Sequence, residues 1–349
     1  MTDNYNRVIS LNFIIRSYSS LKEEFFSMKR KLGAVAACAL ASAMLCSFTG
    51  CADQASSSNG NIYVIVKSKQ SPEYWDVVKS GAVDAAAEVG YNIIYDAPES
   101  EADIDDQIAM VDKAVQEKAA AIVVAPTNTE DLNDCISNAV SAGVPVVTVD
   151  ARCSLEDIVY IGTDNRAAGV VAGREAKGVL KDTKKVAVIA LQEGSAVSDE
   201  RSGGFIDEMT GTAEVLETTY CNAERDVAKS QAIELINKYP DLEMIYAVNQ
   251  GSTLGACDAI AELGVADKVT LIGFDSCDES ISFLKSGVLD GFVVQNPYNM
   301  GYLGVRNADK MINGENVALT IDTGTTFVDL DNLNDADVQL LLYPLGKNE

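Results

Sequence analysis

Residues 121–149 read AIVVAPTNTEDLNDCISNAVSAGVPVVTV, and this stretch indicates the fold class of the chain. The run at 121–124 is short, apolar and rich in β-branched residues, which predicts a buried strand. Apolar residues at helical spacing over 132–141 predict a helix, and the β-branched run at 144–149 predicts a second strand. A strand, a helix and a strand in this order form a unit in which the two strands run parallel.

The same alternation continues on both sides of this stretch. We expect further strands at 62–66, 92–95, 185–190, 213–219, 244–248, 270–273 and 291–295, and further helices at 74–89 (opened by Pro72), 104–117, 165–180, 199–210, 226–238, 253–263, 280–286 and 298–312. Strands rich in Val and Ile that alternate with helices predict parallel sheets covered on both faces. The chain is therefore expected to have an α/β fold, and its 349 residues suffice for two domains.

The composition excludes several function classes. The formal net charge of −25 argues against nucleic-acid binding, which needs a basic surface. The chain has no His, so His-based triads and His metal ligands are ruled out. It also lacks the glycine-rich dinucleotide and phosphate-loop motifs, and GSTLG at 251–255 is not a hydrolase nucleophile elbow. We therefore expect no enzyme, no catalytic residue, no cofactor and no metal site.

The N-terminus carries the pattern of an export signal. A basic cluster at 28–31 precedes an uncharged, apolar run at 32–50. The run ends in Phe48-Thr49-Gly50-Cys51, which resembles the lipobox of bacterial lipoproteins, in which a Cys is lipidated and becomes the first residue. The alternative is an uncleaved membrane anchor with a chance Cys. The first interpretation makes 28–50 a lipoprotein signal peptide and places the protein on the extracytoplasmic face of the cell membrane, attached through a lipid on Cys51.

Two segments flank this signal. Residues 1–27 show no clear pattern, and we interpret them as an over-extended gene model with the true start at Met28, or as a disordered segment. Lys22-Glu23-Glu24 fits a purine-rich ribosome-binding sequence just upstream of that start. Residues 51–61 are small and polar, which predicts a flexible tether.

The cysteines that follow Cys51 are widely spaced, at 135, 153, 221, 257 and 277. This spacing matches no zinc motif. Buried roles as small hydrophobic residues are expected for most of them, and the sequence leaves their redox state open.

Polar side chains stand where the apolar strand runs stop. Ligands of open parallel sheets bind at the carboxyl ends of the strands, so these positions are candidate binding residues. They include Lys67 to Trp75 after the first strand, Asp150 to Arg152 after the fourth, and Asn249, Asp275 and Gln295 in the second half.

Several short motifs, in order, resemble the ribose/galactose type of periplasmic sugar-binding protein, the type I solute-binding component of ABC importers. The motifs are Ser71-Pro72-Glu73-Tyr74-Trp75 with Gly81-Ala82 and Ala85-Ala86, Thr148-Val149-Asp150, Ile161-Gly162-Thr163-Asp164-Asn165 with Ala168-Gly169, Asn249 with Leu254-Gly255-Ala256, Ile272-Gly273-Phe274-Asp275, and Val294-Gln295-Asn296-Pro297. The resemblance spans about 62–330. It implies two similar lobes, each a parallel sheet flanked by helices, joined by crossovers near 163–165, 295–297 and 323–326.

The implied lobes are 62–163 plus 296–324 and 164–295 plus 325–345. The implied function is capture of a sugar or polyol in the cleft between the lobes, for delivery to an ABC permease. An alternative on the same fold is a receptor that presents a sugar-like signal, such as autoinducer-2, to a membrane sensor.

Sugar recognition needs aromatic faces for the ring and carboxylates or amides for the hydroxyl groups. The resemblance implies that Tyr74 or Trp75 stacks on the ring and that Asp150 binds hydroxyls from the first lobe. It gives Asn249 and Asp275 the same role in the second lobe. Gln295, at a crossover, is expected to bond both the ligand and the hinge.

The chain departs from ribose binders at three positions of the implied site. Ala151 replaces an Arg, with Arg152 one place later, Asp199 aligns roughly with another Arg, and Glu73 replaces an aromatic residue. These changes predict a more acidic pocket and argue against ribose itself. Further candidate contacts are Ser71, Glu73, Arg152, Asp199 and Arg201, with Lys67 and Gln70 near the first strand end.

Overall fold

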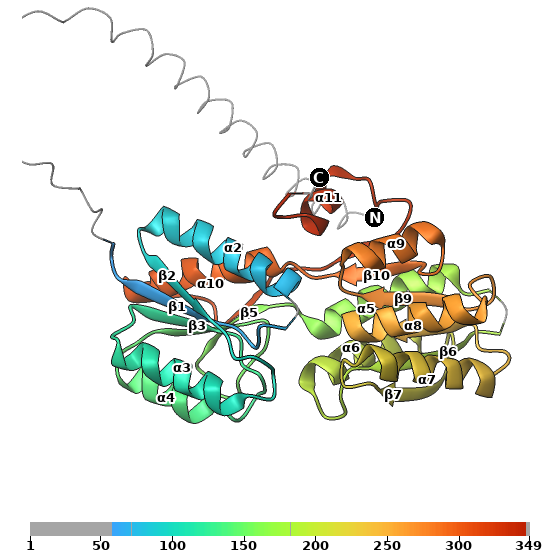
Figure 1. Cartoon of the computed structure of the whole chain (residues 1–349), viewed down its shortest axis with the longest axis horizontal. Coiled ribbons are helices and arrows are strands. Elements are labelled where there is room, and N and C mark those ends of the chain that lie inside the picture. The colour runs from blue at the N-terminus through green and yellow to red at the C-terminus, as the bar shows by residue number, and fades with distance from the viewer. Residues whose placement is uncertain (1–57, 71, 182, 347–349) are drawn as a thin grey trace, which may run out of the picture. The chain divides into compact units, whose positions relative to one another are not determined.

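The structure is a computed structural model that describes residues 58–70, 72–181 and 183–346. Several predictions from the sequence concern residues outside these ranges: the segments 1–27 and 28–50, the lipidation site at Cys51, most of the tether, and Ser71. The described chain forms two six-stranded sheets, each flanked by helices (Figure 1). The expected α/β class with two similar lobes is confirmed.

The first lobe is built on the sheet of order β11-β5-β4-β3-β1-β2, in which all neighbouring strands are parallel. Its strands are β1 (Asn61–Ile65), β2 (Asn92–Asp96), β3 (Ala121–Val124), β4 (Val146–Val149), β5 (Val159–Gly162) and β11 (Thr320–Asp322). Its helices are α2 (Pro72–Val89), α3 (Ile104–Gln116), α4 (Asn133–Ser141) and α10 (Pro297–Ile312).

The second lobe is built on the sheet of order β12-β10-β9-β8-β6-β7, which is parallel except for the β10–β12 pair. Its strands are β6 (Lys185–Ala190), β7 (Glu214–Tyr220), β8 (Met244–Ala247), β9 (Thr270–Phe274), β10 (Gly291–Val294) and β12 (Thr326–Val328). Its helices are α5 (Asn165–Val179), α6 (Ala196–Met209), α7 (Arg225–Lys238), α8 (Gln250–Leu263), α9 (Asp278–Ser286) and α11 (Ala336–Leu342).

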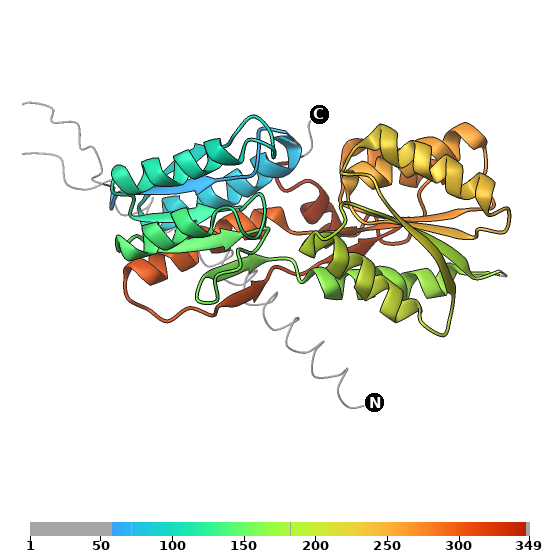
Figure 2. The same ribbon diagram turned by 90° about the horizontal axis from the view of Figure 1, so that it is seen from below.

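Three connections carry the chain between the two sheets. They follow β5, β10 and β11, where the next element belongs to the other lobe. Helix α10, late in the chain, therefore lies beside α2, which is early (Figures 1 and 2). The strand ends next to these connections come from both lobes, so residues that are distant in the sequence lie together at the connections.

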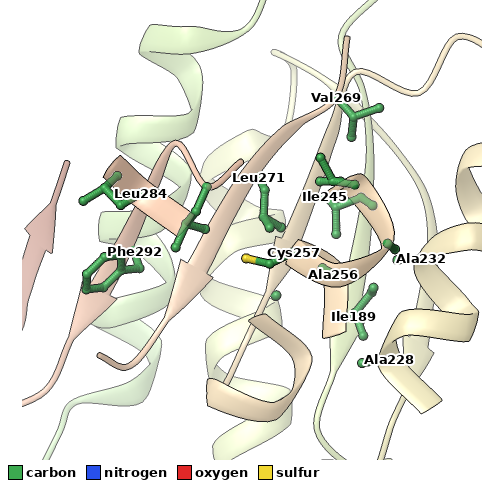
Figure 3. Close-up of a cluster of buried hydrophobic side chains, with 14 of the residues drawn as sticks. Ile189, Ala228, Ala232, Ile245, Ala256, Cys257, Val269, Leu271, Leu284 and Phe292 are labelled. Carbon is green, nitrogen blue, oxygen red and sulfur yellow. The ribbon is translucent and has the colours of Figure 1, made fainter. Parts of the chain in front are cut away.

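Each sheet is buried on both faces because successive strand residues point to opposite sides. In β6, Ala187 and Ile189 pack toward α7 and α8, and Val186 and Val188 pack toward α5 and α6. Figure 3 shows the first of these cores, in which Ile189, Ile245 and Leu271 from three strands meet Cys257 of α8. Cys135 and Cys221 are likewise buried, and all five cysteines in the described part are free thiols.

Glycines allow α2 and α10 to cross at backbone contact. A Cβ on Gly81 would lie 2.0 Å from the carbonyl oxygen of Tyr298, and one on Gly301 would lie 1.9 Å from that of Val78. No larger residue fits at either position without separating the helices. The contact fixes α2, whose first turn carries Tyr74 and Trp75, against the rest of the first lobe.

The structure adds elements that the sequence pattern did not predict. Strand β5, which ends just before the first expected crossover, was not predicted as a strand, and neither β11, β12 nor α11 was expected. The strands β11 and β12 have three residues each, too few for a recognisable period. Strand β4 begins at Val146 rather than at 144, directly after Pro145, which has no N–H to donate to a sheet ladder.

Candidate functional site

A cavity of about 720 Å³ lies at the carboxyl ends of the strands of both lobes. We call it the interlobe cavity. Its lining residues are Lys67, Gln70, Tyr74, Trp75, Glu101, Thr127, Asn128, Thr129, Asp150, Ala151, Arg152 and Tyr160 from the first lobe, and Asn165, 191–197, Glu200, Arg201, Asn222, Ala223, Asn249, Gln250, Gly251, Leu254, Asp275 and Gln295 from the second lobe and the crossovers.

Two aspartates occupy equivalent places in the two lobes. Asp150 directly follows β4, and Asp275 directly follows β9. Both adopt left-handed backbone conformations, with φ of 64° and 67°. Asp tolerates this region better than most residues other than Gly. In each lobe the backbone thus turns sharply at the strand end, where the carboxylate lines the interlobe cavity.

The first-lobe wall centres on an ion pair that is largely shielded from solvent. Lys67 Nζ lies 2.7 Å from Asp150 Oδ2, and the two side chains are 14% and 12% exposed. Tyr74 donates its hydroxyl to Asp150 Oδ1 at 2.7 Å. Burial alone would raise the pKa of Asp150, but the charge and hydrogen bond of Lys67 outweigh it and the pKa is lowered. Asp150 is therefore held as a carboxylate with two fixed donors.

The pKa values of its partners respond to the same charges. Burial would lower the pKa of Lys67, but the Asp150 carboxylate and the charge of Glu101 raise it. Burial and the charge of Asp150 raise the pKa of Tyr74 well above its usual value. All three groups thus keep the protonation states that hold the cluster together: ammonium, phenol and carboxylate.

Aromatic rings complete the first-lobe wall. Tyr74 and Trp75 meet edge to face, with centroids 5.0 Å apart. Trp75 belongs to the first-lobe core and also lines the cavity. The Arg152 guanidinium lies 3.9 Å from the centroid of the Tyr160 ring. The lining residues of the second lobe include no aromatic side chain, so an apolar ring face can stack only on the first lobe.

Arg201 of α6 is the cation of the second-lobe wall and is only 5% exposed. Its Nε donates to Asn165 Oδ1 at 2.9 Å, and its Nη1 donates to the carbonyl oxygen of Val248 at 2.9 Å. The guanidinium also lies 3.7 Å from the centroid of the Phe274 ring. These contacts fix the orientation of the guanidinium group, and its remaining N–H groups are available to a ligand.

Asp275 is the second-lobe carboxylate of the site. Gln295 Nε2 donates to its Oδ1 at 2.7 Å. Burial raises its pKa, and the charges of Arg201 and the hydrogen bond from Gln295 only partly oppose this. The charge of Asp150 raises it further. The cost of burying the negative charge is therefore less fully offset for Asp275 than for Asp150, and a hydrogen-bond donor from a ligand would stabilise the ionised form of Asp275.

Asn249 is the N-cap of α8. Its Oδ1 accepts hydrogen bonds from the backbone N–H and the hydroxyl of Ser252, in a reciprocal capping box. The carbonyl side of the amide is thus used by the helix. Asn249 also lines the cavity, and its amide nitrogen is the group that can donate to a sugar hydroxyl.

The charges of the lining argue against anionic ligands. Five carboxylates line the cavity, Glu101, Asp150, Glu193, Glu200 and Asp275, against three cations, Lys67, Arg152 and Arg201. Excess negative charge disfavours anionic ligands. Carboxylates and amides that face one cavity instead suit a ligand with many hydroxyl groups.

Most residues expected from the sequence line this cavity. They are Tyr74, Trp75, Asp150, Asn249, Asp275, Gln295, Arg152 and Arg201, together with Lys67 and Gln70. Glu73 and Asp199 do not line it, and both are exposed. Each lies one or two residues before a cavity residue on a helix, and neighbouring side chains of a helix point to different faces, so these two side chains point away from the cavity. Ser71 lies outside the described residues.

The motifs did not identify several loop residues of the lining, such as Glu101, Asn128, Glu193 and Asn222. Asn128 and Glu193 follow β3 and β6, so the strand-end argument would have found them if it had been applied to every strand. Across 58–70, 72–181 and 183–346, no cluster of three or more Cys, Asp or Glu could hold a metal ion. Within the same ranges, no helix is long and apolar enough to cross a membrane.

Comparison with known proteins gives one consistent result. Residues 62–316 match the family model described as periplasmic binding protein domain. A curated relative, the ribose import binding protein RbsB of Haemophilus influenzae, is 28% identical over 81% of this chain and 95% of its own length.

Solved structures agree with this match. A solute-binding protein of an ABC transporter from Agrobacterium vitis, with bound D-fucose, is 32% identical with a TM-score of 0.75, and 81% of this chain aligns with 100% of that one. A carbohydrate transporter solute-binding protein from Agrobacterium radiobacter, in complex with D-arabinose, is 31% identical with a TM-score of 0.74, and 81% of this chain aligns with 98% of that one.

Proposed function

This chain belongs to the periplasmic binding protein domain family, and we propose that its interlobe cavity captures an uncharged monosaccharide for an ABC importer. The relatives are sugar-binding proteins of such importers, which supports the general function of sugar capture. The restriction to an uncharged monosaccharide rests on the cavity itself. The family binds transport substrates and is not a family of enzymes.

One observation carries the proposal: hydrogen-bonding groups from both lobes meet in one cavity. Asp150 and Tyr74 come from the first lobe, and Asn249, Asp275 and Arg201 come from the second. A ligand that contacts both walls binds better when the lobes are close together and so favours that arrangement. Such differential contact is what a receptor needs to signal its loaded state to a permease.

The chemistry of the walls supports a polyhydroxylated ring. Each carboxylate accepts from hydroxyl groups, Arg201 and Asn249 donate to them, and Tyr74 and Trp75 offer a ring face. The solved structures of similar proteins include one with bound D-arabinose and one with bound D-fucose. Ala151 stands where the resemblance implies an Arg in ribose binders, and this supports a sugar other than ribose.

The proposed location is the extracytoplasmic side of the cell membrane, with attachment through a lipid on Cys51. The relatives are extracytoplasmic binding proteins, which supports the first part. The lipid anchor rests on the Phe48-Thr49-Gly50-Cys51 pattern alone.

A thermal-shift screen on the full-length protein tests the proposal. The panel is D-arabinose, D-fucose, D-allose, D-ribose, D-glucuronate and ribose 5-phosphate. A ligand at 100 times its Kd stabilises the folded protein by about 2.7 kcal/mol, which raises its melting temperature. We expect a clear rise with at least one neutral sugar and none with the two anions. A rise only with an anion, or with no sugar at all, would contradict the proposal.

A further inference from the structure

A chain of two hydrogen bonds leads from the first crossover to the interlobe cavity. Thr163 Oγ1 donates to Gln295 Oε1 at 2.8 Å, and Gln295 Nε2 donates to Asp275 Oδ1 at 2.7 Å. Thr163 and Gln295 are only 2% and 5% exposed. Thr163 directly follows β5 of the first lobe, and Gln295 directly follows β10 of the second. The chain therefore joins two crossovers to a carboxylate of the cavity.

The chemistry of the three groups fixes the direction of this chain. Gln295 turns its NH₂ group toward Asp275, and this is the orientation that an ionised carboxylate needs because it can only accept. Its carbonyl oxygen then faces Thr163 and needs a donor, which the threonine hydroxyl supplies. Tyr160 holds the crossover in place, because its hydroxyl donates to the backbone carbonyl of Thr163 at 3.0 Å.

The orientation of the Gln295 amide matters for the ligand because it decides what faces Asp275. With the observed orientation, Oδ1 of Asp275 accepts a hydrogen bond from Gln295. With the amide reversed, the carbonyl oxygen of Gln295 would face a carboxylate and repel it. The other groups that face Asp275 are Arg201 of α6, the carboxylate of Asp150 and the backbone N–H of Gln250.

We propose that Thr163 is a positioning residue for sugar binding: its hydroxyl bonds the carbonyl oxygen of Gln295 and so holds the amide nitrogen of Gln295 against the Asp275 carboxylate, which accepts from the ligand. Thr163 is not among the residues that line the cavity, so it acts through Gln295. The effect on sugar affinity rests on the proposed function, whereas the effect on Asp275 does not.

Two substitutions and one control separate this role from a structural one. Thr163→Val has nearly the same shape but cannot donate, and Thr163→Ser keeps the donor. The control is Thr219→Val, since Thr219 Oγ1 donates to Gln231 Oε1 at 3.0 Å and Gln231 Nε2 donates to the backbone carbonyl of Tyr220 at 2.8 Å. This is the same threonine–glutamine chemistry, at residues that do not line the cavity.

The first measurement needs no ligand. The pKa of Asp275 is read from the ¹³C carboxyl titration of the unliganded full-length protein, with Asp275→Asn to assign the signal. We expect Thr163→Val to raise this pKa, and Thr163→Ser and Thr219→Val to leave it unchanged. An unchanged pKa in Thr163→Val, or an equal rise in Thr219→Val, would overturn the proposal.

The second measurement is calorimetric titration with D-arabinose and with D-fucose. Thr163→Val should bind about 5- to 50-fold more weakly than wild type, and Thr163→Ser and Thr219→Val should bind within about twofold. Equal binding by wild type and Thr163→Val would overturn the positioning role and leave the proposed function standing. If wild type binds neither sugar and the pKa of Asp275 still rises in Thr163→Val, the positioning of Asp275 stands and the sugar assignment fails.

Discussion

Removal of Lys67 should destabilise the first lobe because it leaves the Asp150 carboxylate buried without its cation. The two groups are 2.7 Å apart and 14% and 12% exposed, so water replaces little of the lost interaction. Breaking one side of a buried ion pair costs about 3–5 kcal/mol of the free energy of unfolding. Tyr74 still donates to Asp150, which reduces the expected cost of Lys67→Met to about 2–4 kcal/mol at pH 7.

The cost should depend on pH in a defined direction. In wild type the pKa of Asp150 is lowered despite burial, mainly by Lys67, so the pair stabilises the fold above the unfolded pKa and loses this contribution as pH falls through the folded pKa. In Lys67→Met, burial acts without that opposition and raises the pKa of Asp150. The carboxylate then takes up a proton on acidification more readily than in wild type. The difference in stability between variant and wild type should therefore shrink as pH falls from 7 toward 4.

Urea unfolding at several pH values measures this difference. Trp75 is the only tryptophan and lies in the first-lobe core, so its fluorescence reports on the lobe that is affected. The matched control is Lys185→Met, which breaks an ion pair of 2.6 Å whose side chains are 31% and 49% exposed, and it should cost at most about 1 kcal/mol. Adding Asp150→Asn to Lys67→Met should recover much of the loss. Equal costs for the two lysine variants, or a Lys67→Met cost that does not change with pH, would refute the reasoning.

Two further changes test the packing and the anchor. Gly81→Ala would place a Cβ 2.0 Å from the carbonyl oxygen of Tyr298 and should lower the free energy of unfolding in urea by about 1–3 kcal/mol. The control Gly178→Ala, whose Cβ meets nothing within 4 Å, should be neutral or slightly stabilising. A neutral Gly81→Ala would contradict the contact between the two helices. Cys51→Ala should move the protein from the membrane fraction to the soluble fraction or block its processing, and unchanged membrane attachment would indicate that 32–50 is an uncleaved anchor.

The sequence predicted the fold where strands were long, apolar and flanked by periodic helices. The strands β1, β3, β6 and β9 are buried on both faces, so their sequences are continuous apolar runs that predict buried strands directly. Strands β11 and β12 are three-residue edge strands, formed by pairing across the fold rather than by local preference. Local pattern contains no information about such pairing.

The candidate site was predictable in part, for a physical reason. In a parallel sheet all strands end at one edge, so polar residues after strand runs are brought together whatever their distance in sequence. This placed Asp150, Asn249, Asp275 and Gln295. The pairing of Lys67 with Asp150 was not predictable, because β3 lies between β1 and β4 and only the geometry of the sheet brings their ends within reach. The same holds for Thr163 and Gln295, which are joined only by the packing of two crossovers.

The measurement that tests the central claim most directly is calorimetric titration of wild type and Asp275→Ala with the neutral sugar that stabilises wild type most. Asp275 lines the interlobe cavity from the second lobe, and a hydrogen bond to a charged group in such a site is worth about 1.5–3 kcal/mol. We predict that Asp275→Ala, still folded by circular dichroism, binds the sugar about 10- to 150-fold more weakly than wild type. Equal affinity in the two proteins would contradict the assignment of this cavity as the sugar site.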